Sequence, residues 1–242
     1  MVYLRSVFLF LLEFCKKLYQ CHLFWLYRLK LFFQHRAWDK QHKNNLFYTE
    51  GDDYALSTLG QHFLAGVMDH LPGLMAILAP SYNSYRRFHK GSWSGGEYLS
   101  YGTDNRESAV RIPSRYLGNE MGSVNIEVKP ADNSANPYLA IGSIIAAGID
   151  GMEKKRDPGQ PLNINMYKDG DNYPNLKKLP TDLEEALEQL SSSEPLLSAF
   201  GEKNITSYLK LKQQELKDFN SKETFSKKEP VTEWEKKNTL DC

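Results

Sequence analysis

The chain has 242 residues, of which 41% are hydrophobic and 25% charged, a composition typical of a globular protein with one large domain or two small ones. Its 30 basic and 30 acidic residues cancel, which excludes a whole-chain electrostatic field that would favour nucleic acid. Its three cysteines, Cys15, Cys21 and Cys242, form neither a disulfide framework nor a CxxC metal pair, which favours a reducing cytoplasm.

Residues 1–36 mix aromatic residues and leucines with lysines and arginines. Glu13, Lys16 and Lys17 interrupt the longest apolar run, so the segment is too short to be a transmembrane helix, and no signal-peptide cleavage site follows it. Three interpretations remain: an interfacial membrane helix, a basic helix lying in solvent, or a segment foreign to the fold. The membrane interpretation is the least favoured of the three.

The residues after Tyr54 predict an amphipathic helix that ends at Pro72-Gly73, followed by a second apolar run, Leu74 to Ala79. Its apolar face has a period of 3.6 residues and consists of Leu56, Leu59, Phe63, Leu64, Val67 and Leu71. His62 and His70 are eight residues apart, which is not the spacing of a metal pair, so we expect surface or capping histidines.

Residues 82–102 are rich in Ser, Gly, Tyr and Arg, which indicates a loop. Its Gly91–Gly96 stretch matches neither the P-loop nor the GxGxxG motif. Three strands are predicted, at residues 98–101, 108–112 and 123–129. In the third, Asn125, Glu127 and Lys129 share one face, which fits either a functional site or an ordinary exposed strand.

The second half of the chain predicts three helices and a tail. Asn136-Pro137 is a good helix start, and the small or aliphatic residues after it indicate a buried helix. Thr181 and Glu184 match a capping box. The last helix places Ile205, Leu209, Leu216 and Phe219 on one face. The charged residues after Phe219 predict a tail that is disordered or lies on a neighbouring molecule.

Several linked motifs resemble one enzyme family. They are "NSYRR", "GTDNRESAVRIP", "NIEVKPADNSANPYL" and "AAGIDG", and "LPTDLEEALEQL" follows them. Together they resemble the C-terminal half of the glutamine synthetase catalytic domain, in its type I and glutamine-synthetase-like branch. The resemblance implies an α+β fold in which an antiparallel sheet lines a cleft with helices packed behind it. It divides the chain into an atypical segment at 1–44, the catalytic part at 45–220 and a charged tail at 221–242.

The resemblance also implies a reaction: ATP phosphorylates the side-chain carboxylate of glutamate, and ammonia or another amine displaces the phosphate. Carried over by position, Arg87 would bind the glutamate carboxylate, and Arg106 and Arg111 would face the ATP phosphates, with Arg106 acting in catalysis. Glu127 would be a ligand of Mg2+ or Mn2+. Lys129 stands at the glutamate site where the family usually has an arginine. A lysine keeps the positive charge but cannot form the two parallel hydrogen bonds that an arginine makes to a carboxylate.

The chain departs from the family at several positions. Asn125 replaces a further arginine, and Ser92-Trp93-Ser94 stands near the place of a glutamate that helps to deprotonate bound ammonium. Glu97 could replace that glutamate only if the loop shifted. This departure favours an amine other than ammonia, or no catalysis.

The family motifs of the front half are missing from residues 1–36, so the chain resembles an N-terminally truncated member. Phe32 and Gln34 stand where the family has two metal-binding histidines. Because Glu127 alone cannot hold two or three cations, we expect the chain taken by itself to be feeble or inactive.

We therefore expect an ATP-dependent glutamate–amine ligase that works in the cytoplasm as a homo-oligomer or with full-length family subunits, with no nucleic-acid partner. The alternative is a catalytically inactive scaffold, which magnesium-dependent ATP binding would rule out. Tyr167 lies near the position of a tyrosine that is modified in some bacterial relatives.

Overall fold

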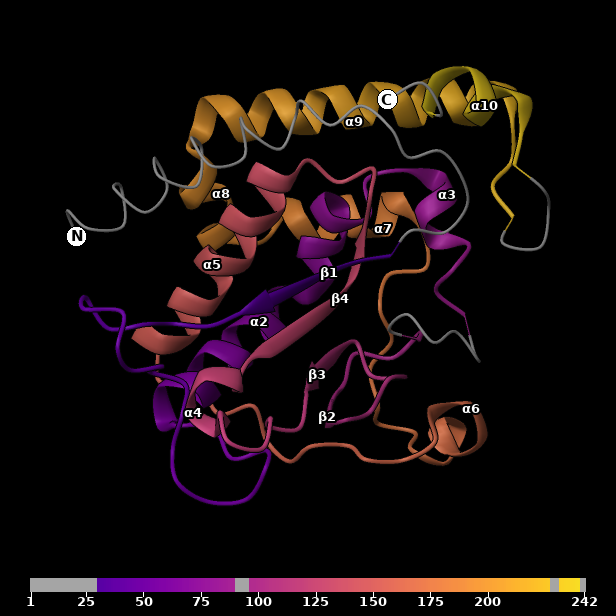
Figure 1. Cartoon of the computed structure of the whole chain (residues 1–242). Helices are drawn as coiled ribbons and strands as arrows, with labels where there is room; N and C mark the ends of the chain where they lie inside the picture. The colour runs from indigo at the N-terminus through magenta and orange to yellow at the C-terminus, as the bar shows by residue number, and fades with distance from the viewer. Residues whose placement is uncertain (1–29, 90–95, 227–230, 240–242) are drawn as a thin grey trace.

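A computed structural model describes residues 30–89, 96–226 and 231–239, and its centre is a small mixed sheet. The strands lie in the order β1-β4-β3-β2, and their bounds are Lys30–His35 (β1), Tyr101–Thr103 (β2), Val110–Ile112 (β3) and Ile126–Asp132 (β4). The α+β class is therefore confirmed (Figure 1).

One pair of strands departs from the antiparallel arrangement that the sequence predicted. The β1–β4 and β3–β4 pairs are antiparallel, but β2 and β3 run parallel, with Tyr101 opposite Val110. Asp104, at the end of β2, has a left-handed backbone (φ +50°), and its N–H donates to the carbonyl of Ile112. The chain therefore turns sharply after β2.

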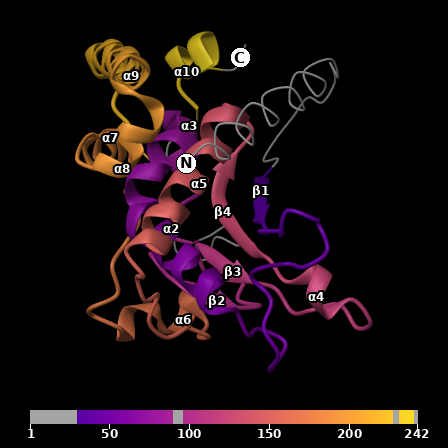
Figure 2. The ribbon, with the colours of Figure 1, turned by 90° about the vertical axis from the view of Figure 1, so that its left-hand side faces the viewer.

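The helices pack in layers on one side of the sheet. Figure 2 shows α2 (Thr58–Leu78) and α5 (Pro137–Glu153) between the sheet and an outer group of helices, α7 (Leu183–Ser191), α8 (Glu194–Phe200) and α9 (Glu202–Lys222). Short helices occupy the loops: α3 (Tyr82–Tyr85), α4 (Glu120–Ser123), α6 (Met166–Asp169) and η1 (Gly170–Asn172). The core lies between β4, α2 and α5, where Val128, Leu71 and Ile144 are fully buried.

Two glycines let α2 and α5 approach closely. A Cβ atom on Gly66 would lie 2.2 Å from the carbonyl oxygen of Ala147, and one on Gly151 would lie 2.2 Å from the carbonyl oxygen of His62. Both distances are far below van der Waals contact. The α2–α5 crossing therefore requires glycine on each helix.

The predicted break at Pro72-Gly73 is wrong, because α2 continues through both residues to Leu78. Proline in a helix interior removes one backbone hydrogen bond and costs about 3 kcal/mol. The buried run Leu74 to Leu78 that follows offsets this cost. Gly73 also lies close to the backbone of α7, since a Cβ atom at this position would be 3.1 Å from the Gln189 carbonyl oxygen.

The helix starts are partly as predicted. The Asn136 side chain caps α5 by accepting from the N–H groups of Tyr138 and Leu139. For α7 the cap is Asp182, which accepts from the Glu185 N–H at 2.9 Å, so the predicted Thr181–Glu184 capping box is wrong by one residue.

His70 has a structural role that the sequence did not indicate. Its Nε2 lies 3.0 Å from Asp150 Oδ2 on α5, and its Nδ1 lies 3.0 Å from the Ser193 hydroxyl before α8. Burial alone would raise the pKa of Asp150, but hydrogen bonds from His70 and Lys154 and their charges lower it below its usual value. His62 contacts the Arg156 carbonyl oxygen at 2.7 Å.

Both ends of the described chain contribute to the fold. β1 lies within the segment 1–44 and pairs with β4. The tail prediction is wrong for α10 (Glu233–Thr239), which folds against α3 (Figure 1). Residues 1–29 and Ser92-Trp93-Ser94 lie outside the described residues. Within the described part of the chain, no helix is long and apolar enough to span a bilayer.

Candidate functional site

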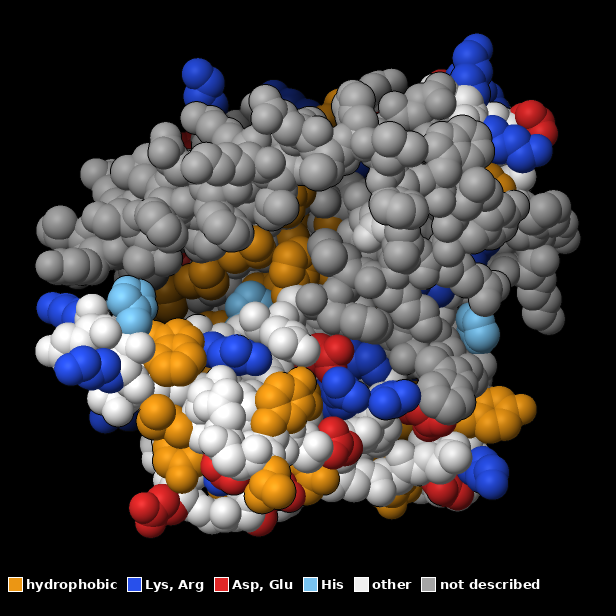
Figure 3. All heavy atoms as spheres, in the orientation of Figure 1, with side chains coloured by type: hydrophobic (Ala, Val, Ile, Leu, Met, Phe, Trp, Pro, Cys, Tyr) orange, Lys and Arg blue, Asp and Glu red, His pale blue; other side chains and the backbone are white. Residues whose placement is uncertain are grey.

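Apart from Arg87, which follows α3, the predicted site residues lie on β3, on β4 and on the loop between β2 and β3. Arg111 and Glu127 are register partners on adjacent strands, and Arg111 Nε lies 2.5 Å from Glu127 Oε2. The two atoms form an ion pair without an aligned hydrogen bond. Figure 3 shows Lys and Arg side chains beside Asp and Glu side chains at the surface around β2 and β3.

The polar face of β4 is buried, so the exposed-strand interpretation is wrong. Asn125, just before β4, is 5% exposed, and Glu127 and Lys129 on the strand are 4% and 2% exposed. Burying a carboxylate and an ammonium is costly unless each has a partner. Glu127 has Arg111, while Asn125 donates to the Ser123 carbonyl oxygen at 2.8 Å. These polar side chains therefore face partners inside the protein and not solvent.

Lys129 links β4 to the loop that carries Arg106. Its ammonium donates to the main-chain carbonyl oxygen of Arg106, and its backbone N–H donates to the Ala109 carbonyl oxygen at 3.1 Å. The Arg106 side chain itself is exposed. Lys129 therefore holds the backbone of Arg106 while the loop presents the Arg106 guanidinium to solvent.

A second residue, which the sequence did not single out, anchors this loop. The Asn105 side-chain amide donates to the carbonyl oxygens of Leu162 and Ile164, both at 3.0 Å, and its Oδ1 accepts from the Glu107 N–H. Three hydrogen bonds from one side chain restrict the backbone on both sides of Arg106. The feature of the sequence that could have identified Asn105 is its place directly before Arg106.

Asp104 completes the loop on the side of α2. It accepts hydrogen bonds from the Tyr54 hydroxyl at 3.0 Å and the Ser114 N–H at 3.1 Å. Burial alone would raise the pKa of Asp104, but these hydrogen bonds and the charge of Arg111 lower it. Asp104 therefore stays ionised and adds a negative charge near Arg111.

Arg87 lies at the opposite end of β4 from Glu127. Its Nη2 is 3.9 Å from Asp132 Oδ2, and its guanidinium lies over the Phe88 ring, 4.1 Å from the centroid. Burial lowers the pKa of Arg87, and the charge of Asp132 opposes this effect. A guanidinium that stacks on a ring keeps its planar edge oriented, which suits the recognition of an anionic ligand.

The described residues do not make a complete metal site. Glu127 supplies one carboxylate that faces Arg111, and residue Gln34 of β1 is its register partner on the other side. Within residues 30–89, 96–226 and 231–239 no group of three or more His, Cys, Asp or Glu could hold a metal ion. A divalent cation prefers six or more oxygen ligands, so these residues alone do not fit one.

Two other candidates have structural partners. Glu97 forms an ion pair with Lys178, with Oε1 and Nζ 2.9 Å apart, so it is not placed as a free base. Tyr167, on α6, is 54% exposed, and its backbone N–H donates to Glu107.

Comparison with known proteins identifies relatives of most of the chain. A sequence model of the family described as "Glutamine synthetase, catalytic domain" matches residues 35–235. Glutamine synthetase of Sulfolobus acidocaldarius is 39% identical over 185 residues, which cover 74% of this chain and 38% of that protein. Glutamate–methylamine ligase of Methyloversatilis universalis is 36% identical over 184 residues, covering 72% and 39%.

Solved structures show the same likeness. A structure of GmaS in complex with ADP is similar with a TM-score of 0.65 and 34% sequence identity, over 82% of this chain and 43% of that one. GmaS without ligand is similar with a TM-score of 0.64. The chain thus spans about two fifths of the length of these relatives.

Proposed function

Because this chain belongs to the family of the glutamine synthetase catalytic domain, we propose that it acts in an ATP-dependent ligase that joins an amine to glutamate. In the first step, a side-chain carboxylate oxygen of glutamate attacks the γ-phosphorus of ATP and releases ADP, which leaves a glutamyl phosphate. In the second, the amine nitrogen attacks the acyl carbon. Phosphate leaves with the electron pair of the broken C–O bond, and the nitrogen loses a proton.

The observation that carries the proposal is the set of cations around β3 and β4. Arg106 lies on an anchored loop, Arg111 on β3 and Lys129 on β4, and Glu127 on β4 faces Arg111. Both proposed steps pass through anionic phosphoryl species. Cations held in place before the reaction stabilise such species without the cost of reorganising solvent.

Each residue has a proposed role. Arg106 and Arg111 contact the ATP phosphates and the phosphoryl group in transfer. Arg87 and Lys129 bind the glutamate substrate, and the bond from Lys129 to the Arg106 carbonyl oxygen couples the two binding regions. Glu127 would contribute a single carboxylate to Mg2+ or Mn2+, since no group of three or more His, Cys, Asp or Glu among the described residues could hold the ion.

The proposed amine is ammonia or a small alkylamine such as methylamine. The glutamate–methylamine ligase resembles this chain about as closely as the glutamine synthetases do. The Ser92-Trp93-Ser94 sequence, in place of the usual glutamate, favours the alkylamine. A cytoplasmic, oligomeric enzyme is the proposed form, and the cysteine pattern is consistent with a reducing compartment.

The inactive scaffold has less support. A scaffold has no use for a buried carboxylate and ammonium on one strand, which cost stability to maintain. Magnesium-dependent ATP binding, measured by calorimetry, separates the two functions because only the ligase requires it.

The test is phosphate release that depends on both glutamate and ATP, with ammonium, methylamine and ethylamine compared as the third substrate. Arg106→Ala should abolish this release, because it removes the exposed guanidinium while Asn105 and Lys129 still hold the loop. Arg156→Ala is the matched control, since Arg156 pairs with Asp69 of α2 and Asp150 of α5. Retained activity in Arg106→Ala would refute the site assignment.

A further inference from the structure

The C-terminal helix α10 is attached to α3 through an aromatic cluster. Trp234 is 7% exposed, and its ring lies edge-on to Phe219 (centroids 5.3 Å apart) and to Tyr82 of α3 (6.2 Å). Tyr82 in turn stacks on Phe219 at 3.7 Å. The Trp234 indole N–H donates to Asp218 Oδ2 at 2.6 Å, so both the apolar and the polar part of the ring have partners.

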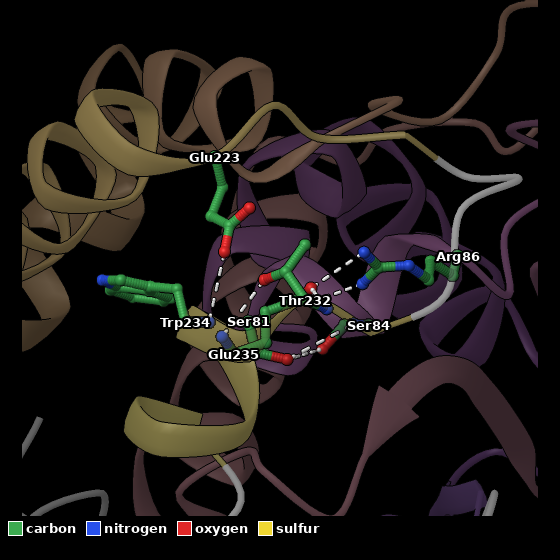
Figure 4. A network of polar contacts seen from close by, with 7 residues as sticks. All are labelled: Ser81, Ser84, Arg86, Glu223, Thr232, Trp234 and Glu235. Atoms are coloured by element: carbon green, nitrogen blue, oxygen red, sulfur yellow. Dashed lines mark hydrogen bonds and ion pairs between the residues drawn. The ribbon is translucent and has the colours of Figure 1, made fainter.

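One buried carboxylate joins the start of α10 to Arg86. Glu235 is 0% exposed, and its two oxygens accept from Nη1 and Nη2 of Arg86 in a bidentate pair (Figure 4). The same carboxylate accepts from the Thr232 N–H at 2.9 Å, while the Thr232 hydroxyl accepts from the Glu235 N–H at 3.2 Å. Thr232 and Glu235 therefore form a capping box whose carboxylate also neutralises Arg86.

Arg86 directly precedes Arg87 in the sequence, so the two residues share one stretch of backbone. It closes α3, with its N–H donating to the Asn83 carbonyl oxygen at 3.2 Å, and the Phe88 N–H donates to the Tyr85 carbonyl oxygen at 3.2 Å. The helix α3 has only four residues, so it has little stability of its own. The position of Arg87 therefore depends on what holds Arg86.

We propose that Glu235 is a positioning residue for Arg87, so that the C-terminal segment 232–239 sets the affinity of the site for the carboxylate of glutamate. This role rests on the proposed function of Arg87. Removing the charge of Glu235 deprives Arg86 of its buried bidentate partner and loosens α3, because a buried guanidinium is costly when its carboxylate is lost. The Arg87 guanidinium then samples positions in which it cannot contact the carboxylate of glutamate.

The first test is glutamate binding and steady-state kinetics on the full protein. Glu235→Gln keeps the size of the side chain and should raise the KM for glutamate about tenfold, equivalent to about 1.4 kcal/mol, with the KM for ATP unchanged. Glu233→Gln is the matched control on the same helix, since Glu233 is exposed and pairs only with Lys236 among the contacts described. An unchanged glutamate KM in Glu235→Gln overturns the proposal.

The second test does not depend on activity. Hydrogen exchange at the amides of Arg86 and Phe88 should become about tenfold faster in Glu235→Gln and stay unchanged in Glu233→Gln. Exchange in this segment should be faster in Arg86→Met than in the double variant Arg86→Met/Glu235→Gln. The single change leaves a buried carboxylate without its guanidinium. If no variant binds glutamate but exchange responds as stated, the proposed function is wrong and the positioning role stands. Unchanged exchange refutes the positioning role whatever the activity.

Discussion

Arg111 and Glu127 face each other across β3 and β4, with Arg111 Nε 2.5 Å from Glu127 Oε2. The Glu127 side chain is 6% exposed, so its charge is compensated by this arginine and not by water. Gln34 of β1, the other register partner of Glu127, has no charge to offer. The stability of the central strand therefore depends strongly on the Arg111 guanidinium.

Arg111→Met should lower the free energy of unfolding by about 3 kcal/mol, because it leaves a buried carboxylate without a countercharge. The double variant Arg111→Met/Glu127→Gln should recover part of this loss, since the remaining group is neutral. Urea unfolding at pH 7 measures both. Lys236→Met serves as the control: it removes an exposed ion pair with Glu233 and should cost less than about 1 kcal/mol. Equal losses for the single and double variants would contradict this account of the pair.

His35 predicts a dependence of stability on pH. Burial lowers the pKa of His35 from 6.5 to about 4, and its ring lies 5.9 Å from that of Phe63. Because the folded pKa is below the unfolded one, the unfolded chain binds more protons as the pH falls. The contribution of His35 is fully present above pH 6.5 and is lost as the pH falls toward about 4, amounting to up to about 3 kcal/mol.

The replacement His35→Phe should therefore flatten the stability curve between pH 6.5 and pH 4 while leaving stability at pH 7.5 little changed. Urea midpoints measured across this range compare the two proteins. His42→Asn is the control, because His42 is exposed and asparagine tolerates its left-handed backbone; it should keep the slope of the natural chain. The same slope in His35→Phe would show that His35 is not the group that titrates.

Gly66→Ala should destabilise the protein by about 3 kcal/mol, because overpacking forces backbones apart. The added Cβ would lie 2.2 Å from the Ala147 carbonyl oxygen and 2.6 Å from the Gly151 nitrogen, so backbone atoms would have to shift. Gly60→Ala is the control within the same helix: its nearest neighbour would be the Phe47 Cβ atom at 3.3 Å. Thermal unfolding of both variants tests the difference, and similar melting temperatures would mean that α2 and α5 can separate at little cost.

The sequence predicted the parts of the fold that follow from local pattern. The alternation on β4 places Glu127 and Lys129 on one face, as observed, and Asn136 caps α5. Pattern alone could not tell whether that polar face meets solvent or Arg111, because the answer depends on β3. The family resemblance identified the family, which the match over residues 35–235 confirms, but it did not predict this contact.

The errors have specific physical causes. Pro72 is a helix breaker by propensity, but the tertiary burial of the apolar residues after it outweighs the local cost. The tail after Phe219 has few apolar residues, and one of them, Trp234, is enough to attach it because Tyr82 and Phe219 form a site for its ring. The Thr232–Glu235 capping box was readable in the sequence as Thr-x-x-Glu and would have indicated α10.

The strand order has a consequence for the way the chain folds. Among the described strands, β4 comes last in the sequence but lies inside the sheet, between β1 and β3. During synthesis, β1 must therefore wait without its partner until the whole of β4 has left the ribosome, while α2 can already form from contiguous residues. Closing such long loops late makes folding slow, and in the meantime β1 lacks the pairing with β4. The strand that carries Glu127 and Lys129 thus also completes the sheet.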